Sequence, residues 1–126
     1  MESKSYSFEK LHVWTDIRGL IRDVYELTAT LPEIEKFGLV MQMRRAAISV
    51  SSNLAEGSSR TSPKDQAHFY QISYSSMMEL LSQLIVSYDL KYITESSYSA
   101  LRQDIEGITY KLNSLRSTAL KRIKSK

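Results

Sequence analysis

The 126-residue sequence contains no cysteine, only four glycines and two prolines, and no long apolar run. Without cysteine the chain cannot form a disulfide framework or a thiolate metal site, and a reducing compartment is expected. No stretch approaches the roughly 18 consecutive apolar residues of a membrane-spanning helix, and no basic start is followed by an apolar block. We therefore expect a soluble, cytoplasmic protein without a membrane partner.

The net charge of +3 is concentrated at the C-terminus. Four positive charges belong to Lys121, Arg122, Lys124 and Lys126, so residues 1–120 carry a net charge of −1. We predict a helical domain over residues 1–120 and a basic tail over residues 121–126. A solvated helix end, favoured by the helix dipole, is the simplest interpretation of the tail. Phosphate binding, which releases counterions from a nucleic acid, is the alternative.

Apolar spacing predicts four helices and no strand. The first spans about residues 8–30 and ends before Pro32, and the second spans about residues 38–57. Gly57 is expected to close the second helix in the left-handed conformation. Ser62, Pro63 and Asp65 have the spacing of an N-cap, a first helical proline and a capping carboxylate, which predicts the start of the third helix.

The fourth helix has the most regular pattern, with apolar residues separated by alternating gaps of three and four. These residues are Tyr98, Leu101, Ile105, Ile108, Leu112, Leu115 and Ala119. Because the connectors are short, sequential helices must pack antiparallel. We predict an all-α fold, an antiparallel up-down-up-down four-helix bundle.

The first helix has more apolar width than one bundle core needs. Its residues Val13, Leu20 and Leu27 form a row beside Trp14, Ile21 and Thr28. Excess apolar width indicates cover by another chain, and a wide core face is the alternative interpretation.

Motifs for catalysis are absent. The two histidines, His12 and His68, fall on different predicted helices, and neither has a second ligand-type residue at the spacing of a helical metal motif. No serine lies in a nucleophile elbow, and there is no glycine-rich phosphate loop. We predict a protein that is not an enzyme and has no metal or cofactor.

The second helix carries an ordered polar row in addition to its apolar row. Antiparallel pairing about a turn near residue 60 brings Glu79 within a turn of Gln42, Arg44 and Arg45, which predicts a partly buried salt bridge that fixes the helix register. The predicted structural polar network comprises Gln42, Arg45, Ser49, Asn53, Glu56 and Glu79.

The adjacent arginines 44 and 45 lie about 100° apart on a helix, so one faces a neighbouring helix and the other faces solvent. A solvated side chain is the default for the second arginine, with contact to phosphate or to another subunit as alternatives. The predicted nucleic-acid contacts are Arg44, Arg60, Lys121, Arg122, Lys124 and Lys126.

A family resemblance extends over about residues 8–118, with its most specific segment in the second helix. The residues that carry it are Phe8, Leu11, Trp14, Leu31-Pro32, Glu35, Phe37-Gly38-Leu39, Gln42, Arg44-Arg45-Ala46-Ala47, Ser49-Val50, Asn53-Leu54-Ala55-Glu56-Gly57, Arg60, Phe69, Ser76, Glu79-Leu80 and Tyr92-Ile93. With these residues the chain resembles the four-helix bundle proteins encoded by intervening sequences in bacterial 23S ribosomal RNA genes.

The resemblance implies a closed homo-oligomer. A similar protein, the accessory variability determinant of diversity-generating retroelements, forms a homopentamer and binds its reverse transcriptase and nucleic acid through a strongly basic surface. The present chain departs from that branch in charge, since residues 1–120 carry a net charge of −1.

Two functions follow as hypotheses. The first is a non-catalytic, homo-oligomeric scaffold, expected to be a pentamer, that contacts ribosomal or other structured RNA weakly. The second is a protein-interaction adaptor that recruits a partner enzyme, such as a reverse-transcriptase-like protein, without contacting nucleic acid. RNA binding should weaken steeply with salt, whereas capture of a protein through an apolar face should not.

Overall fold

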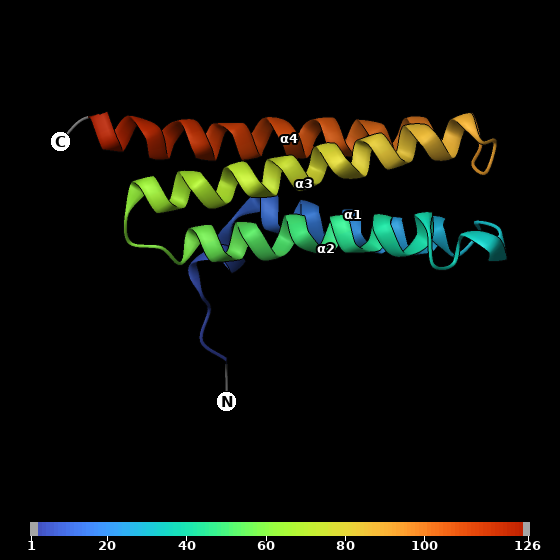
Figure 1. Ribbon diagram of the computed structural model, residues 1–126. Coiled ribbons are helices and arrows are strands. Elements are labelled where there is room, and N and C mark those ends of the chain that lie inside the picture. The colour runs from blue at the N-terminus through green and yellow to red at the C-terminus, as the bar shows by residue number, and fades with distance from the viewer. Residues whose placement is uncertain (1–2, 125–126) are drawn as a thin grey trace.

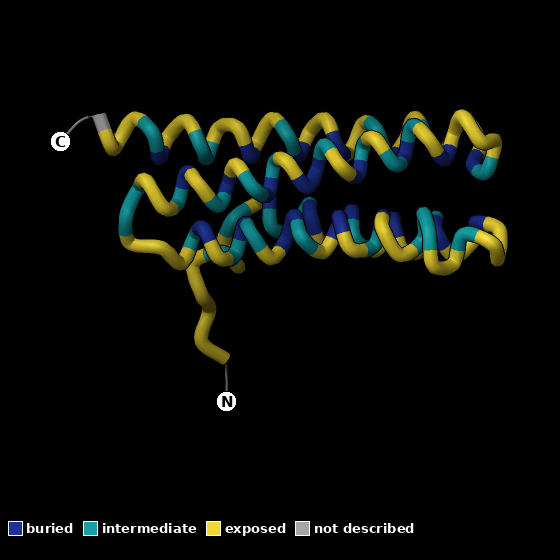
Figure 2. The backbone as a smooth tube through the Cα atoms, viewed as in Figure 1, coloured by how far each residue is buried: buried dark blue, intermediate teal, exposed yellow. Residues whose placement is uncertain are grey.

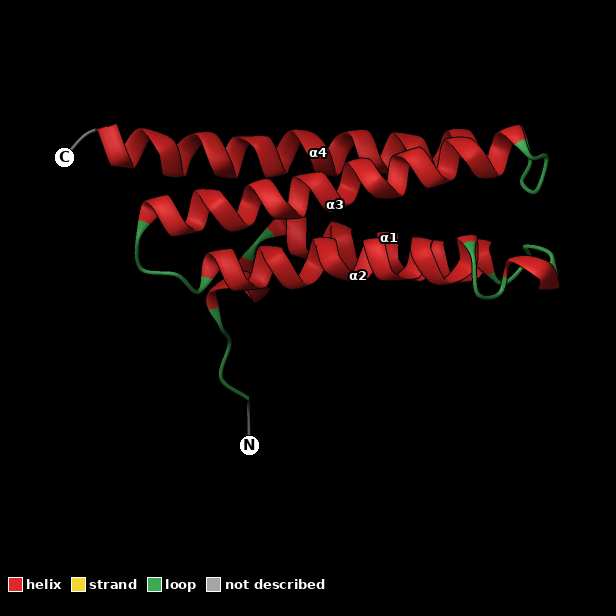
Figure 3. Ribbon diagram, viewed as in Figure 1, coloured by secondary structure: helices red, strands yellow, loops and turns green. Residues whose placement is uncertain are grey.

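The computed structural model describes residues 3–124, except the side chain of Lys124. This part of the chain contains helices and no strand, as Figure 3 shows. The long helices are α1 (His12–Thr28), α2 (Leu39–Ser58), α3 (Pro63–Asp89) and α4 (Glu95–Lys124), and the short 3₁₀ helices are η1 (Ser7–Lys10) and η2 (Glu33–Glu35). The prediction of four helices is confirmed, and α4 continues through the predicted basic tail as far as Lys124.

The helix starts and ends follow local chemistry, with two departures from the predictions. The Ser62 hydroxyl accepts a hydrogen bond from the Asp65 amide at 3.3 Å, and Pro63 is the first residue of α3, as predicted. The first helix begins at His12 because Leu11 is extended and separates it from the 3₁₀ turn. The left-handed cap at Gly57 is wrong, because Gly57 lies inside α2 and no glycine among the described residues has a positive φ.

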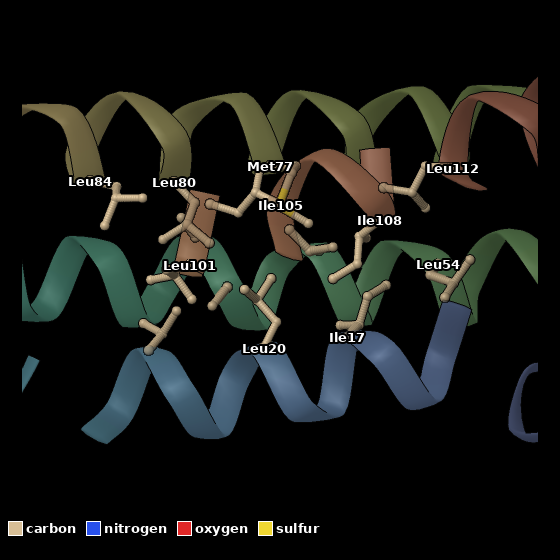
Figure 4. Close-up of a cluster of buried hydrophobic side chains, with 14 of the residues drawn as sticks. Ile17, Leu20, Leu54, Met77, Leu80, Leu84, Leu101, Ile105, Ile108 and Leu112 are labelled. Atoms are coloured by element: carbon tan, nitrogen blue, oxygen red, sulfur yellow. The ribbon is translucent and has the colours of Figure 1, made fainter. Parts of the chain in front are cut away.

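All four helices contribute to one apolar core. Figure 4 shows side chains of α1, α2, α3 and α4 pointing toward one another. The largest side chains with less than 2% exposure are Ile17, Leu20, Val24, Met43, Val50, Leu54, Met77, Leu80, Leu84, Ile105 and Leu112. The predicted row on α4 faces this core, with Tyr98 and Leu115 half-buried at its edges. The heptad pattern therefore identified the buried side of α4.

Each helix packs against two others. Helix α1 contacts α2 and α4, and α3 contacts the same two helices from the other side. In Figure 1 the connectors lie at alternating ends of the molecule, and the α2–α3 connector is at the same end as the C-terminal end of α4. Figure 2 shows that exposed segments alternate with buried ones along every helix. No helix in the described range is long and apolar enough to cross a membrane.

Candidate interaction surfaces

The contact between α2 and α3 contains small and polar side chains that are held by hydrogen bonds. The hydroxyls of Ser49 and Ser76 lie 2.8 Å apart and share a hydrogen bond. The Asn53 amide donates to the Ser49 carbonyl at 2.9 Å and to its hydroxyl at 3.1 Å. The fully buried Ser73 donates to the Val50 carbonyl at 2.7 Å. The structure therefore brings Ser49 and Asn53 of the predicted network together.

The other predicted members of this network do not join it. Gln42 and Arg45 are exposed and form no side-chain hydrogen bond or ion pair within residues 3–124. Glu56 is exposed and pairs with Arg60 at 2.6 Å. The salt bridge predicted for Glu79 is wrong, because Glu79 is exposed and accepts only from Gln83, at 3.5 Å. The core-facing side of α3 is occupied by Met77, and a residue two positions further is turned about 200° away from it.

The two adjacent arginines have the opposite roles to those predicted. Arg44, a predicted nucleic-acid contact, is half-buried against the end of α1. Its Nε donates to the Thr28 hydroxyl at 2.8 Å, its Nη2 donates to the Tyr25 carbonyl at 3.2 Å, and its guanidinium lies 4.5 Å from the Tyr25 ring centroid. The Tyr25 carbonyl also accepts from the Ala29 amide at 3.1 Å, so Arg44 adds a charged donor to the last turn of α1, where the helix dipole is negative. Arg45, a predicted member of the internal network, is the arginine that faces solvent.

A second basic region lies at the other end of α2. The Arg60 guanidinium packs 4.7 Å from the Phe69 ring centroid, and the Arg60 carbonyl accepts from the Gln66 side chain at 2.8 Å. The Gln66 amide oxygen accepts in turn from Arg122. Burial raises the pKa of the nearby Tyr70 hydroxyl, and the charge of Arg122 opposes that rise.

The predicted nucleic-acid contacts therefore do not form one surface. Arg60 and Arg122 are linked through Gln66, and Lys121 is exposed beside them. Arg44 lies roughly 20 Å away along α2. The predicted contacts Lys124, through its side chain, and Lys126 lie outside the described part of the chain.

A row of exposed apolar side chains lies on the connector around η2 and on α2. Ile34 is 84% exposed and Phe37 is 76% exposed, and Met41 and Ile48 continue the row along the outside of α2. We call Ile34, Phe37, Met41 and Ile48 the apolar stripe. Between the stripe and Tyr25 of α1 lies an open groove of about 510 Å³, lined also by Lys36, Arg44 and Arg45. The stripe is therefore an apolar surface with a basic rim.

The stripe is presented on a connector that is held in place. One Glu35 oxygen accepts from the Leu39 amide at 3.3 Å, at the start of α2. The other Glu35 oxygen accepts from the Tyr92 hydroxyl at 3.0 Å, which ties η2 to the turn between α3 and α4. This hydrogen bond raises the Tyr92 pKa. Ile34 and Phe37 are thus exposed on an anchored segment.

The sequence left two interpretations of the wide apolar face of α1 open, and the structure agrees with the wide core face for most of that helix. Trp14, Ile21 and Leu27 are half-buried against the core of their own chain, and Phe8 from η1 covers Trp14 with ring centroids 4.7 Å apart. The sequence held a signal for the stripe, because Phe37, Met41 and Ile48 repeat at spacings of four and seven and fall outside the core row of α2.

A different groove separates α1 from α4. One part of about 430 Å³ continues into another of about 340 Å³, and Asp23 and Asp104 line both parts. The positions opposite each other are glycines, Gly19 and Gly107, and an added Cβ on either meets no atom within 4 Å. Asp16 pairs with Lys111 at one end. We call this feature the acidic groove.

The carboxylates of the acidic groove repel one another. Partial burial raises the pKa of Asp104, and the charges of Asp23 and Asp16 raise it further. Neither Asp23 nor Asp104 forms an ion pair with a described side chain. Within residues 3–124, no group of three or more histidine, aspartate or glutamate residues is arranged to hold a metal ion. The centre of the groove is therefore an anionic surface.

A model of the family described as 23S rRNA-intervening sequence protein matches residues 9–114. The chain belongs to the 23S rRNA-intervening sequence protein family. This finding confirms the family resemblance seen in the sequence, and the relation to the retroelement protein stays a prediction. The part of the chain that matches the intervening-sequence proteins contains the apolar stripe and the acidic groove, and it ends before Lys121.

One solved structure is similar to this intervening-sequence protein over most of its length. It is a protein of unknown function from the S23 ribosomal protein family of Bacteroides thetaiotaomicron, with a TM-score of 0.77 and 22% sequence identity. The similarity covers 82% of this chain and 97% of that one, and it shows a shared fold. A comparison with curated proteins gives no match.

Proposed function

We propose that this 23S rRNA-intervening sequence protein is a non-catalytic, homo-oligomeric scaffold whose subunit is an antiparallel up-down-up-down four-helix bundle. The alternating connectors in Figure 1 support the direction of the helices. The observation that carries the proposed self-association is the apolar stripe, because the chain already has a complete core and still exposes Ile34 and Phe37 almost fully. The family resemblance supports a closed ring of five copies.

The physical reason is the cost of leaving the stripe in water. Burying one large apolar side chain stabilises a contact by about 1.5–3 kcal/mol. Ile34 and Phe37 are exposed enough to contribute nearly that much each, and the partly exposed Met41 and Ile48 add less, so the row offsets part of the entropy that two chains lose when they associate. The row also lies next to an open groove, so a second chain can cover both together. A contiguous apolar surface of this kind is typical of protein interfaces.

Light scattering and native mass spectrometry test the scaffold. The chain mass is 14.5 kDa, and we expect a defined multiple of it at micromolar concentration. Replacing Phe37→Asp should shift the assembly to the single-chain mass, because a charge then occupies the centre of the contact. The matched control is Tyr110→Asp on α4, since Tyr110 is also 76% exposed but lies outside the stripe. A wild-type protein that stays a single chain at high concentration would refute the proposal.

A second candidate function is a weak RNA contact at the end of the molecule where Arg60 and Arg122 meet through Gln66. Two arginines held on one side of a helix end can both reach one phosphate backbone, and exposed Lys121 adds a third charge. The double variant Lys121→Gln/Arg122→Gln should flatten the dependence of log affinity on log salt, by about one unit for each phosphate that is no longer neutralised. The control Lys91→Gln, at the opposite end of α3, should leave the slope unchanged.

The apolar stripe also supports an adaptor function, in which a partner enzyme such as a reverse-transcriptase-like protein covers it. The two uses of the stripe differ in the state of the purified protein. A scaffold is a multiple of the chain mass before any partner is added, whereas an adaptor is a single chain until the partner binds. The mass measurement therefore separates them.

A further inference from the structure

We propose that the groove between α1 and α4 holds one helix of a partner protein, and that this helix carries apolar residues in one half and basic residues in the other. The proposed scaffold assembles through the apolar stripe, and the groove gives it a separate surface on which to hold a partner. Because the partner helix does not use the stripe, its binding does not depend on self-association.

The groove runs along most of α1 and α4. The acidic groove continues past Lys111 into a third part of about 350 Å³, which is lined by Leu115 among others. Lys111 lines both this third part and the 430 Å³ part of the acidic groove. From Ser97 to Thr118 of α4 the three parts extend about 30 Å, which is the length of a helix of about 20 residues. The groove therefore has the shape of a site for a linear occupant.

A helix fits this surface better than an extended peptide does. The walls of the groove are two α-helices, whose backbone N–H and C=O groups are paired within each helix. An extended segment would find no backbone partners on these walls, unlike a strand that is added to the edge of a sheet. A helix satisfies its own backbone and contacts a groove through side chains alone. The occupant is therefore an amphipathic helix.

The centre of the groove has room for a large side chain of the partner helix. An added Cβ on Gly19 or Gly107 meets no atom within 4 Å, so the space beside both glycines is open. Leu20 and Ile108 line the same part of the groove and are almost fully buried, so they form its floor. A large apolar side chain can therefore lie between the two helices against bare backbone.

The half of the groove toward Thr30 and Ser97 selects basic residues. Asp23 and Asp104 line it together with Glu26, and neither aspartate forms an ion pair with a described side chain. Partial burial raises the pKa of Asp104, and the charge of Asp23 raises it further, so a cation between them relieves an existing repulsion. An arginine of the partner would form charge-assisted hydrogen bonds there, and such pairing fixes the register of a contact.

The opposite half of the groove selects apolar residues. Leu11, Val13 and Leu115 line it, and none of the residues that line it carries a carboxylate. Its lysine, Lys111, is paired with Asp16. The two halves therefore fix which end of the partner helix lies beside which end of the groove.

A synthetic helix tests the groove. The probe is a fluorescein-labelled, alanine-based peptide of about 18 residues, which is long enough to form a helix in water. It carries leucines in one half and arginines in the other, at spacings of three and four so that all share one side. Fluorescence anisotropy should show saturable binding to the wild-type chain. A control peptide with glutamate in place of arginine should not bind.

Matched variants locate the peptide. Asp23→Asn/Asp104→Asn should weaken binding about tenfold or more, because charge-assisted hydrogen bonds are lost. Glu79→Gln/Asp89→Asn changes the net charge of the chain equally but on α3, and it should change the affinity by less than about twofold, since salt screens distant exposed charges. All four residues are exposed, so both variants should fold, as circular dichroism will show.

Two further variants separate shape from charge and the groove from the stripe. Gly107→Leu fills the centre of the groove without changing charge, and it should also weaken binding about tenfold, because the leucine takes the place of a partner side chain. Phe37→Asp alters the stripe alone and should leave the affinity unchanged.

Each contrary result would overturn the proposal. A wild-type chain that does not bind the peptide, or an Asp23→Asn/Asp104→Asn variant that binds it as tightly as the wild type, would show that the groove does not select this helix. Loss of binding in Phe37→Asp would place the peptide on the stripe. Tighter binding after glutamine replaces the basic residues of the tail, residues 121–126, would make the tail the occupant. The proposed self-association would stand in all these cases, because the mass measurement tests it.

Discussion

The α2–α3 contact and the α1–α4 contact enclose the same core but differ in what lies between their helices. Both contain helical glycine. At Gly57 of α2 an added Cβ would lie 2.9 Å from a ring carbon of Tyr70 and 3.0 Å from the Cβ of Phe69, so α3 fills the space. At Gly19 and Gly107 the space is open. Glycine therefore marks close helix approach in one contact and an unfilled groove in the other.

The two contacts also differ in the side chains that line them. Ser73, Ser49 and Ser76 are short, and their hydroxyls find partners across or along the α2–α3 contact, which lets the backbones approach. Partial burial and the charge of Asp23 both disfavour the carboxylate form of Asp104, and we infer that the repulsion between Asp23 and Asp104 holds α1 and α4 apart at the surface. The α2–α3 contact therefore closes the fold of the single chain, whereas the α1–α4 contact leaves an open groove at the surface.

The same substitution in the two contacts should have effects of opposite sign, and this is the largest effect that we expect. Gly57→Ala should destabilise the chain by about 1–3 kcal/mol, because the added methyl group collides with buried Tyr70 and forces α3 to move. Gly107→Ala should stabilise it by about 0.5–1 kcal/mol, because alanine is the better helix former and meets no neighbour.

Urea unfolding followed by circular dichroism, at one protein concentration for all variants, measures both changes. The Phe37→Asp background removes the contribution of assembly to stability. If both glycine variants shift the free energy of unfolding in the same direction, the proposed difference between the two contacts is wrong.

Periodicity predicted the parts of the fold that depend on many residues at once. The α4 row was predicted correctly because seven apolar residues agree on one side of the helix, and the α3 start because Ser62, Pro63 and Asp65 act through neighbours in sequence. Gly57 was predicted wrongly because the rule for helix ends considers only neighbours in sequence. A side chain at this position would collide with Tyr70, which comes from another helix.

The candidate site was less predictable, since it depends on which of two nearly equivalent positions faces a neighbour. Either of the adjacent arginines could have turned toward α1, and the choice is set by the Thr28 hydroxyl and the Tyr25 carbonyl at the end of that helix. The sequence left open whether another chain covers the wide apolar face of α1, because no sequence pattern shows that Phe8 folds back over Trp14.

Removing a buried hydroxyl from the α2–α3 contact should change the free energy of unfolding by an intermediate amount. Ser73→Ala removes the hydrogen bond to the Val50 carbonyl inside the core, which should cost about 0.5–1.5 kcal/mol. Ser75→Ala is the matched control, because Ser75 is two positions away on the exposed side of α3 and should change stability by less than about 0.5 kcal/mol. Equal effects of the two changes would show that the buried hydroxyl does not hold the contact together.

The smallest effect that we expect is a pH-dependent change in the free energy of unfolding when an aspartate of the acidic groove is replaced. Because the folded chain raises the pKa of Asp104, its carboxylate form is less favourable in the folded state than in the unfolded one. That cost is present above the folded pKa and disappears as the pH falls below the ordinary aspartate value of about 4. In the Phe37→Asp background, Asp104→Asn should therefore stabilise the chain at pH 7 and lose this advantage near pH 3.

The gain from Asp104→Asn should stay below about 0.5 kcal/mol, because the side chain is exposed and solvent screens its neighbours. Added salt should reduce it further. Urea unfolding at the two pH values measures the gain. A gain that persists at pH 3 would mean that the new amide stabilises the chain by packing, and the carboxylates would then not be what keeps α1 and α4 apart.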